Sequence, residues 1–193
     1  MILTVIGQAQ DSLSHDRRPL AFQLSFFNHS VSMPFHKILN RQLHPGIQGT
    51  FEVQYSRDRR SMLFQTFDIG AFHNKYNGNG YYLSTELGYR LATKHHVFAE
   101  ALLGGGYLRL YHPTNIYVLT ASGAYERARD RGFSSPLFSL AIGLGYNIPS
   151  SSKYSFSPFI RYQSLLQTHY RPDLGVFPQC AFHAGVRLTL KRS

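Results

Sequence analysis

Apolar and polar residues alternate along most of this chain with a period of two, and this alternation limits the fold more than any other feature. The odd-numbered residues from Ile47 to Tyr55 are apolar or glycine, whereas the even-numbered residues from Gln48 to Ser56 are polar. Successive side chains of a β-strand point to opposite faces. Residues 46–56 therefore predict a strand that lies between an apolar surrounding and a polar one.

The same alternation recurs along the chain, and turn-forming residues separate the segments that show it. No window approaches the roughly 18 apolar residues that a membrane-spanning helix needs, which excludes a helical membrane protein. An even number of antiparallel strands is typical of single-chain bacterial membrane barrels. About eight strands are expected, over residues 20–28, 46–56, 62–74, 81–91, 97–111, 136–148, 154–169 and 180–190.

Composition agrees with one folded domain. The chain has 193 residues, of which 15% are aromatic and 16% are charged. The charged fraction is below the roughly 25% of ordinary soluble domains, and the aromatic content excludes a disordered chain. The only cysteine is Cys180, so no disulfide forms within the chain.

The connections between the predicted strands alternate in length. Three are tight, at residues 57–60, 93–96 and 149–153. Of the four that alternate with them, all but residues 75–80 are long, and the long ones are residues 28–45, 112–135 and 170–179. Transmembrane barrels have short periplasmic turns and longer outer loops. The sequence therefore predicts an all-β, transmembrane up-and-down antiparallel barrel in a bacterial outer membrane.

The polar face of the predicted strands carries charges of both signs among serine, threonine, glutamine and glycine. A barrel of about eight strands has room inside only for side chains, and a buried charge must be paired. The alternative is a solvated sheet face, but the balance of signs favours the lumen. The predicted lumen charge network contains Glu52, Asp68, Glu86, Arg90, Glu100, Arg161, His183 and Arg187.

Aromatic residues on the apolar face collect near the ends of the predicted strands. Tyr55, Tyr89 and Tyr146 lie toward the tight turns, and a second group lies toward the long connections. Aromatic belts at the two membrane interfaces are typical of transmembrane barrels. The second group consists of Tyr81, Tyr107, Phe138 and Phe182.

The two ends of the chain bear on processing and family. Residues 1–9 form a short apolar run ending in a small-x-small pattern, which predicts the remnant of a signal peptide ahead of one barrel domain at 10–193. The whole pattern resembles the small Gram-negative outer-membrane barrels of the OmpA/OmpX type, which often end on an aromatic residue, unlike Ser193 here. An uncharacterised Bacteroidetes-type outer-membrane barrel family is similar at His44–Gly46, Thr85–Tyr89 and Pro158–Gln163. The resemblance implies the fold and names no activity.

A search for catalytic residues and cofactor sites finds little. Some small barrels modify lipid A with a serine and a histidine near the outer leaflet. None of the histidine candidates has a serine or acid at a persuasive spacing, so no catalytic, cofactor-binding or metal site is predicted. His95 and His96 are adjacent and would point apart on an extended chain. The candidates are His29 with Ser30, His73, His112 with Ser122, and His169.

The formal net charge of +10 comes from arginines and lysines that are scattered in turns, loops and termini. That pattern favours contact with membrane lipids and lipopolysaccharide phosphates over nucleic acid binding. We expect a monomer whose outer loops, chiefly 28–45 and 112–135, serve adhesion, ligand binding or envelope structure. The alternatives are an outer-leaflet lipid A-modifying enzyme and a soluble lipocalin-like barrel with apolar side chains inside.

Overall fold

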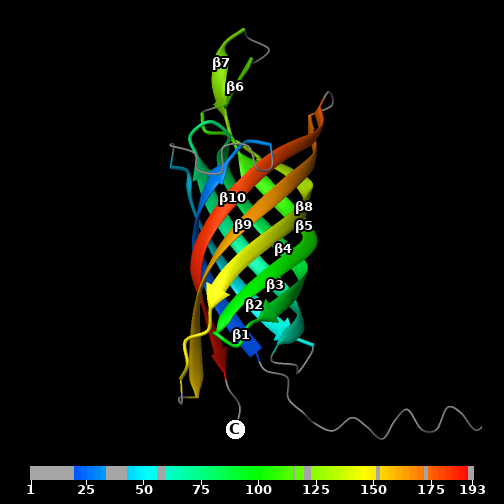
Figure 1. The fold of residues 1–193 in the computed structure, drawn as a ribbon. Helices are drawn as coiled ribbons and strands as arrows, with labels where there is room; N and C mark the ends of the chain where they lie inside the picture. Colours follow the sequence, from blue (N-terminus) through cyan, green and yellow to red (C-terminus); the bar gives the residue numbers. More distant parts are fainter. Residues whose placement is uncertain are drawn as a thin grey trace, which may run out of the picture.

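The computed structural model describes residues 20–33, 43–55, 60–114, 116–119, 123–150, 153–171 and 174–190. Every regular element in these residues is a β-strand, and none is a helix long and apolar enough to cross a membrane. The predicted signal remnant at 1–9 lies outside the described residues. Figure 1 shows a barrel of tilted strands with a small hairpin above one end.

Eight strands close into one antiparallel barrel in the order β1-β10-β9-β8-β5-β4-β3-β2, which confirms the predicted fold class. The first and last strands of the chain close it, because Leu24 of β1 lies opposite both Gly49 of β2 and Val186 of β10. Two short strands, β6 and β7, form a separate hairpin. The strands are β1 Leu20–Ser30, β2 Pro45–Gln54, β3 Ser61–Asn74, β4 Gly78–Ala92, β5 Val97–Tyr111, β6 Ile116–Leu119, β7 Tyr125–Ala128, β8 Phe133–Tyr146, β9 Tyr154–Arg171 and β10 Leu174–Leu190.

Apolar side chains cover the outside of the barrel, and charged ones lie inside. Leu87 is 53% exposed and Ile142 51%, whereas Glu52 and Glu86 are fully buried. This orientation contradicts the lipocalin-like alternative, in which the apolar residues would line an internal cavity. A closed barrel also pairs the backbone groups of every strand with a neighbour, as hydrocarbon requires.

The tight turns between β2 and β3, β4 and β5, and β8 and β9 lie at one end of the barrel, as predicted. At the other end the expected loop at 170–179 is wrong, because β9 runs to Arg171 and β10 begins at Leu174. The expected loop at 112–135 contains the β6–β7 hairpin, and β8 already begins at Phe133. Proline and glycine within residues 172–178 favour a loop and obscured the ends of β9 and β10, while β6 is a short apolar run within a stretch that is otherwise mostly polar.

Aromatic rings that point inward lie against glycines on the neighbouring strand. A methyl group at Gly88 would stand 2.3 Å from the ring of Phe64, its partner across β3 and β4. A ring that fills the space over a cross-strand glycine stabilises a strongly curved sheet. Such pairs recur around the barrel, at Phe27–Gly46, Phe64–Gly88, Phe72–Gly80, Tyr82–Gly70, Phe98–Gly145 and Phe159–Gly185.

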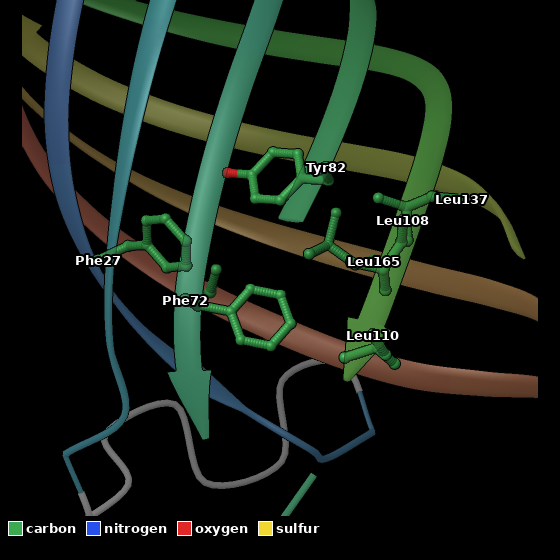
Figure 2. Close-up of a cluster of buried hydrophobic side chains, with 8 residues drawn as sticks. Phe27, Phe72, Tyr82, Leu108, Leu110, Leu137 and Leu165 are labelled. Atoms are coloured by element: carbon green, nitrogen blue, oxygen red, sulfur yellow. The ribbon is translucent and has the colours of Figure 1, made fainter. Parts of the chain in front are cut away.

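A hydrophobic cluster fills the lumen near the outer-loop end of the strands. Figure 2 shows Phe27, Phe72 and Tyr82 together with leucines of β5, β8 and β9. The prediction of a polar lumen is therefore incomplete, because the inward-facing positions change from polar to apolar toward this end. The cluster comprises Phe27, Phe72, Tyr82, Leu108, Leu110, Leu137, Leu165 and Ala181.

Candidate functional site

A closed ring of hydrogen bonds and ion pairs crosses the lumen near the tight-turn end, and we call it the charged ring. Arg90 of β4 donates to Glu52 of β2 through Nη1 and Nη2, each at 2.9 Å. Its Nε donates to Oε2 of Glu100 on β5, also at 2.9 Å. This two-pronged geometry is the strong form of the arginine–carboxylate pair.

Arg161 and Gln23 complete the charged ring. Nη2 of Arg161 on β9 donates to Oε1 of Glu100 at 2.7 Å and to Oε1 of Gln23 at 3.0 Å. Nε2 of Gln23 on β1 then donates to Oε2 of Glu52 at 2.7 Å. The charged ring thus joins five strands. Its two positively charged arginines balance its two negatively charged glutamates, which offsets the cost of burying charge.

Aromatic rings enclose the charged ring. The guanidinium of Arg90 lies 4.1 Å from the ring centroid of Phe64, and that of Arg161 lies 5.0 Å from Phe159. Phe64 and Phe159 are both members of the aromatic–glycine pairs. Gly88 and Gly185 therefore make room for these two rings. Each ring face in turn attracts the cationic guanidinium that lies over it.

The remaining predicted charges lie inside the barrel without belonging to the charged ring. Asp68 accepts hydrogen bonds from Thr50, Thr66 and Gln48, and makes no ion pair among the described residues. Oε1 of Glu86 accepts from Gln163 at 2.7 Å. From the sequence we expect these two acids to pair with arginines, whereas in the structure their hydrogen-bond donors are neutral. Oε2 of Glu86 has no hydrogen-bond partner among the described residues.

His183 and Arg187 of β10 also point inward. His183 lies between Ser25 and Gln163, at 3.2 Å and 3.0 Å, and its ring stacks on Phe27. Nη2 of Arg187 donates to Asn147 at 2.9 Å, while its guanidinium lies 4.6 Å from the ring centroid of Phe98. Its Nε and Nη1 have no partner among the described residues.

The aromatic residues of the two predicted belts point outward from the barrel. Tyr89 and Ser61 share a hydrogen bond of 2.6 Å between their hydroxyls. Tyr81 packs edge to face on Tyr111, with 6.0 Å between the ring centroids. Phe182 is half-buried, whereas the other members are exposed, namely Tyr55, Tyr81, Tyr89, Tyr107, Phe138 and Tyr146.

The histidine candidates are dispersed. His29 is buried in the lumen, where it stacks on Phe72 at 3.9 Å and hydrogen-bonds Gln179 at 2.9 Å. His73 lies on the outside of β3 and contacts Asn79 at 2.6 Å. Ser122 and the side chain of His169 lie outside the described residues. Within the described part of the chain, no group of histidine, cysteine or acidic residues is arranged to hold a metal ion.

His112 forms the only one of these histidine contacts that involves an acid within the described residues. Its ring Nδ1 lies 3.4 Å from Oδ1 of Asp130, and its backbone N–H donates to Oδ2 at 2.6 Å. The backbone N–H of Gly132 donates to the same carboxylate, and this bond holds the pKa of Asp130 below its usual range. Asp130 therefore ties the two chain segments at the base of the hairpin together.

The hairpin of β6 and β7 is the largest feature outside the barrel wall. Its two strands pair only with each other within the described residues, and it projects beyond the end of the barrel that lies opposite the tight turns (Figure 1). Tyr117 and Tyr125 are 58% and 74% exposed, beside the exposed side chain of Arg127. A short, exposed hairpin with aromatic and cationic side chains has the composition of a binding surface.

Sequence reasoning missed the neutral members of the interior. Gln23, Gln163 and Gln179 each link charged or histidine side chains across the lumen. Their only signal in the sequence is their position on the polar face, which they share with many surface glutamines. The hydrophobic cluster had a clearer signal, because Leu108 and Leu110 fall out of phase with Tyr107 and the outward residues of β5.

Comparison with known proteins supports the fold. No protein-family model matches the sequence, and no curated protein matches it. Neisserial surface protein A has a similar structure, with a TM-score of 0.51 and 12% identity over 90% of this chain and 96% of that protein. The attachment invasion locus protein Ail of Yersinia pestis has a TM-score of 0.51 and 13% identity over 90% of this chain and 99% of its own. These neighbours are bacterial outer-membrane β-barrels, and this chain has their fold.

Proposed function

We propose that this chain is an integral outer-membrane barrel, closed inside by its own side chains, that binds a ligand outside the cell through its outer hairpin and loops. The observation that carries the proposal is the β6–β7 hairpin, which leaves the barrel wall and displays Tyr117, Leu119 and Tyr125 to solvent. Exposed apolar side chains are retained where a partner covers them. Arg127 and Arg129 beside them favour a ligand with negative charge.

Membrane insertion rests on the outer surface of the barrel. The exposed leucine, isoleucine and valine side chains form its middle, and the tyrosines toward both ends serve as anchors at the two interfaces. In this proposal the lumen charge network consists of the charged ring and four further side chains, namely Asp68, Glu86, His183 and Arg187. We further propose that the barrel is monomeric, contacts lipopolysaccharide, binds no nucleic acid and belongs to the Bacteroidetes-type family that the motifs resemble.

The ligand role is tested by replacing both exposed tyrosines of the hairpin. Bacteria that display the full chain with Tyr117→Ser and Tyr125→Ser are expected to adhere to host-cell monolayers several-fold less than bacteria with the unaltered chain. Tyr154→Ser is the matched control, because Tyr154 is an exposed tyrosine at the tight-turn end of the barrel. Equal surface display is verified first, and undiminished adherence of the double variant would contradict the role of the hairpin.

The contact between His112 and Asp130 favours a second function, modification of lipid A at the outer leaflet. A histidine oriented by a carboxylate is one part of a nucleophilic site, and this pair lies at the outer rim. Lipid A extracted from a deletion strain and from a strain with His112→Ala is compared by mass spectrometry with that of the parent. We expect identical profiles, and a change in both strains would favour the enzyme instead.

A further inference from the structure

The lipid-facing wall of the barrel contains a groove near the outer-loop end of β1 to β5. It has a volume of about 650 Å³. Gly49 and Ala71, two small residues along it, leave the hollow between larger neighbours. The apolar residues that border it include Leu24, Ile47, Ile69, Leu83, Tyr81 and Tyr107.

The groove leads to polar side chains at the rim. Two further hollows, of about 420 Å³ and 470 Å³, share Tyr81 with it. Asn79 borders both of these hollows, and Arg109 borders the groove and the larger of the two. The lining of the groove itself therefore extends from apolar residues, past Tyr81, to Arg109.

Arg109 is held at that position by its neighbours. Its Nη2 donates to the backbone oxygen of Arg131 at 2.7 Å, and its guanidinium lies 5.6 Å from the ring centroid of Tyr111. In the strand register it stands opposite Tyr81, which itself packs on Tyr111. A guanidinium has five N–H donors, more than this bond uses. The arginine is thus an oriented cation at one end of an apolar groove.

We propose that this groove binds one molecule of lipid A, with an acyl chain along the apolar floor and a phosphate on Arg109. The inference rests on the proposed membrane location and adds a specific lipid partner to it. The charge at the end of the groove decides the occupant, since the phosphate of a net-neutral phospholipid is already balanced by its own headgroup cation, whereas the phosphates of lipid A are not. A second barrel would instead cover that arginine with apolar side chains, which is unfavourable for a charge.

Two substitutions remove the two halves of the site separately. Arg109→Gln removes the charge, and Gly49→Leu fills the floor. A carbon added at Gly49 meets only Ile69, at 3.7 Å, so the barrel accepts the larger side chain. Native mass spectrometry counts the lipid A retained by barrels released from phosphatidylcholine nanodiscs that contain a minor fraction of lipid A. Loss of one surface arginine should lower occupancy about fivefold, and the filled floor should also lower it.

Matched controls isolate the groove. Lys94→Gln removes a cation at the opposite end, and Ala101→Leu enlarges an outward residue of β5 away from the groove. Both controls should retain lipid A like the unaltered chain. Three results would overturn this inference alone. All variants could retain the same amount of lipid A, the unaltered barrel could retain phosphatidylcholine as well as lipid A, or the groove could be covered by a second barrel in a dimer. Failure of the unaltered barrel to insert into nanodiscs would instead overturn the proposed membrane location.

Discussion

Arg90 connects more of the interior than any other charged side chain described here. It binds Glu52 through two nitrogen atoms and Glu100 through a third, and its guanidinium lies over the ring of Phe64. A buried ion pair contributes little net stability against a hydrophobic replacement of the whole group. Removal of one member is different, because the charges that remain lose their partner without regaining water. The charged ring is therefore sensitive to single substitutions.

Arg90→Met should lower the free energy of unfolding by about 3–5 kcal/mol, since it leaves Glu52 and Glu100 buried with fewer partners. Urea unfolding in lipid vesicles, followed by circular dichroism, measures the change. Lys94→Gln is the control, and it should leave stability unaltered because Lys94 is an exposed cation in the turn between β4 and β5. Adding Glu52→Gln to Arg90→Met should cost less than the sum of both single changes. A stability equal to that of the unaltered barrel would refute the structural role of the charged ring.

At the scale of elements, the barrel and the hairpin are separate units joined at one base. The wall strands are fixed by ladders on both sides, whereas β6 and β7 pair only with each other among the described residues. The carboxylate of Asp130 accepts the N–H groups of His112 and Gly132, one from each side of the hairpin. The orientation of the hairpin therefore depends on this ionised side chain, together with the hydrogen bond from Arg109 to the backbone oxygen of Arg131.

The base of the hairpin should loosen in acid and not at neutral pH. The hydrogen bond from the backbone N–H of Gly132 lowers the pKa of Asp130. The ionised Asp130 therefore stabilises the base of the hairpin at pH values above the ordinary aspartate range, and this stabilisation is lost as the pH falls through the lowered pKa. The amide resonance of Gly132, followed by NMR in detergent, should titrate with a midpoint below the ordinary aspartate range. Asp130→Asn should abolish that titration. A midpoint at or above the ordinary aspartate range, or a titration that persists in Asp130→Asn, would contradict this role of Asp130.

At the scale of the whole molecule, the lumen is filled along its length. The charged ring closes it near the tight turns, the layer of Asp68 and Glu86 fills its middle, and the hydrophobic cluster closes it near the outer loops (Figure 2). A barrel of eight strands has an interior just wide enough for side chains. The described side chains therefore fill the lumen along its length.

The unaltered barrel should therefore conduct no ions. Its conductance in a planar lipid bilayer is expected to equal that of the bare bilayer, because no continuous water path crosses the charged ring or the hydrophobic cluster. A wide outer-membrane porin in the same bilayer serves as the positive control. Regular single-channel openings by this chain, absent from preparations without protein, would contradict the filled lumen.

The period-two alternation alone predicts which side chains face lipid and which face the lumen, because a strand alternates its faces locally and needs no distant contact to do so. The outward positions of Leu87 and Ile142 follow directly from that period. The sequence did not determine the ends of β9 and β10, since their outer residues lie beyond the membrane and lack the alternation.

Which lumen residues meet one another depends on how the strands pair and close into the barrel. Arg161 and Gln23 are 138 positions apart, and Arg90 and Glu52 are 38 apart, yet all four belong to one ring. Their contact depends on the register of each strand pair and on the closure of β1 against β10. Register and closure are collective properties of all eight strands, so no local pattern around any one of these residues contains them.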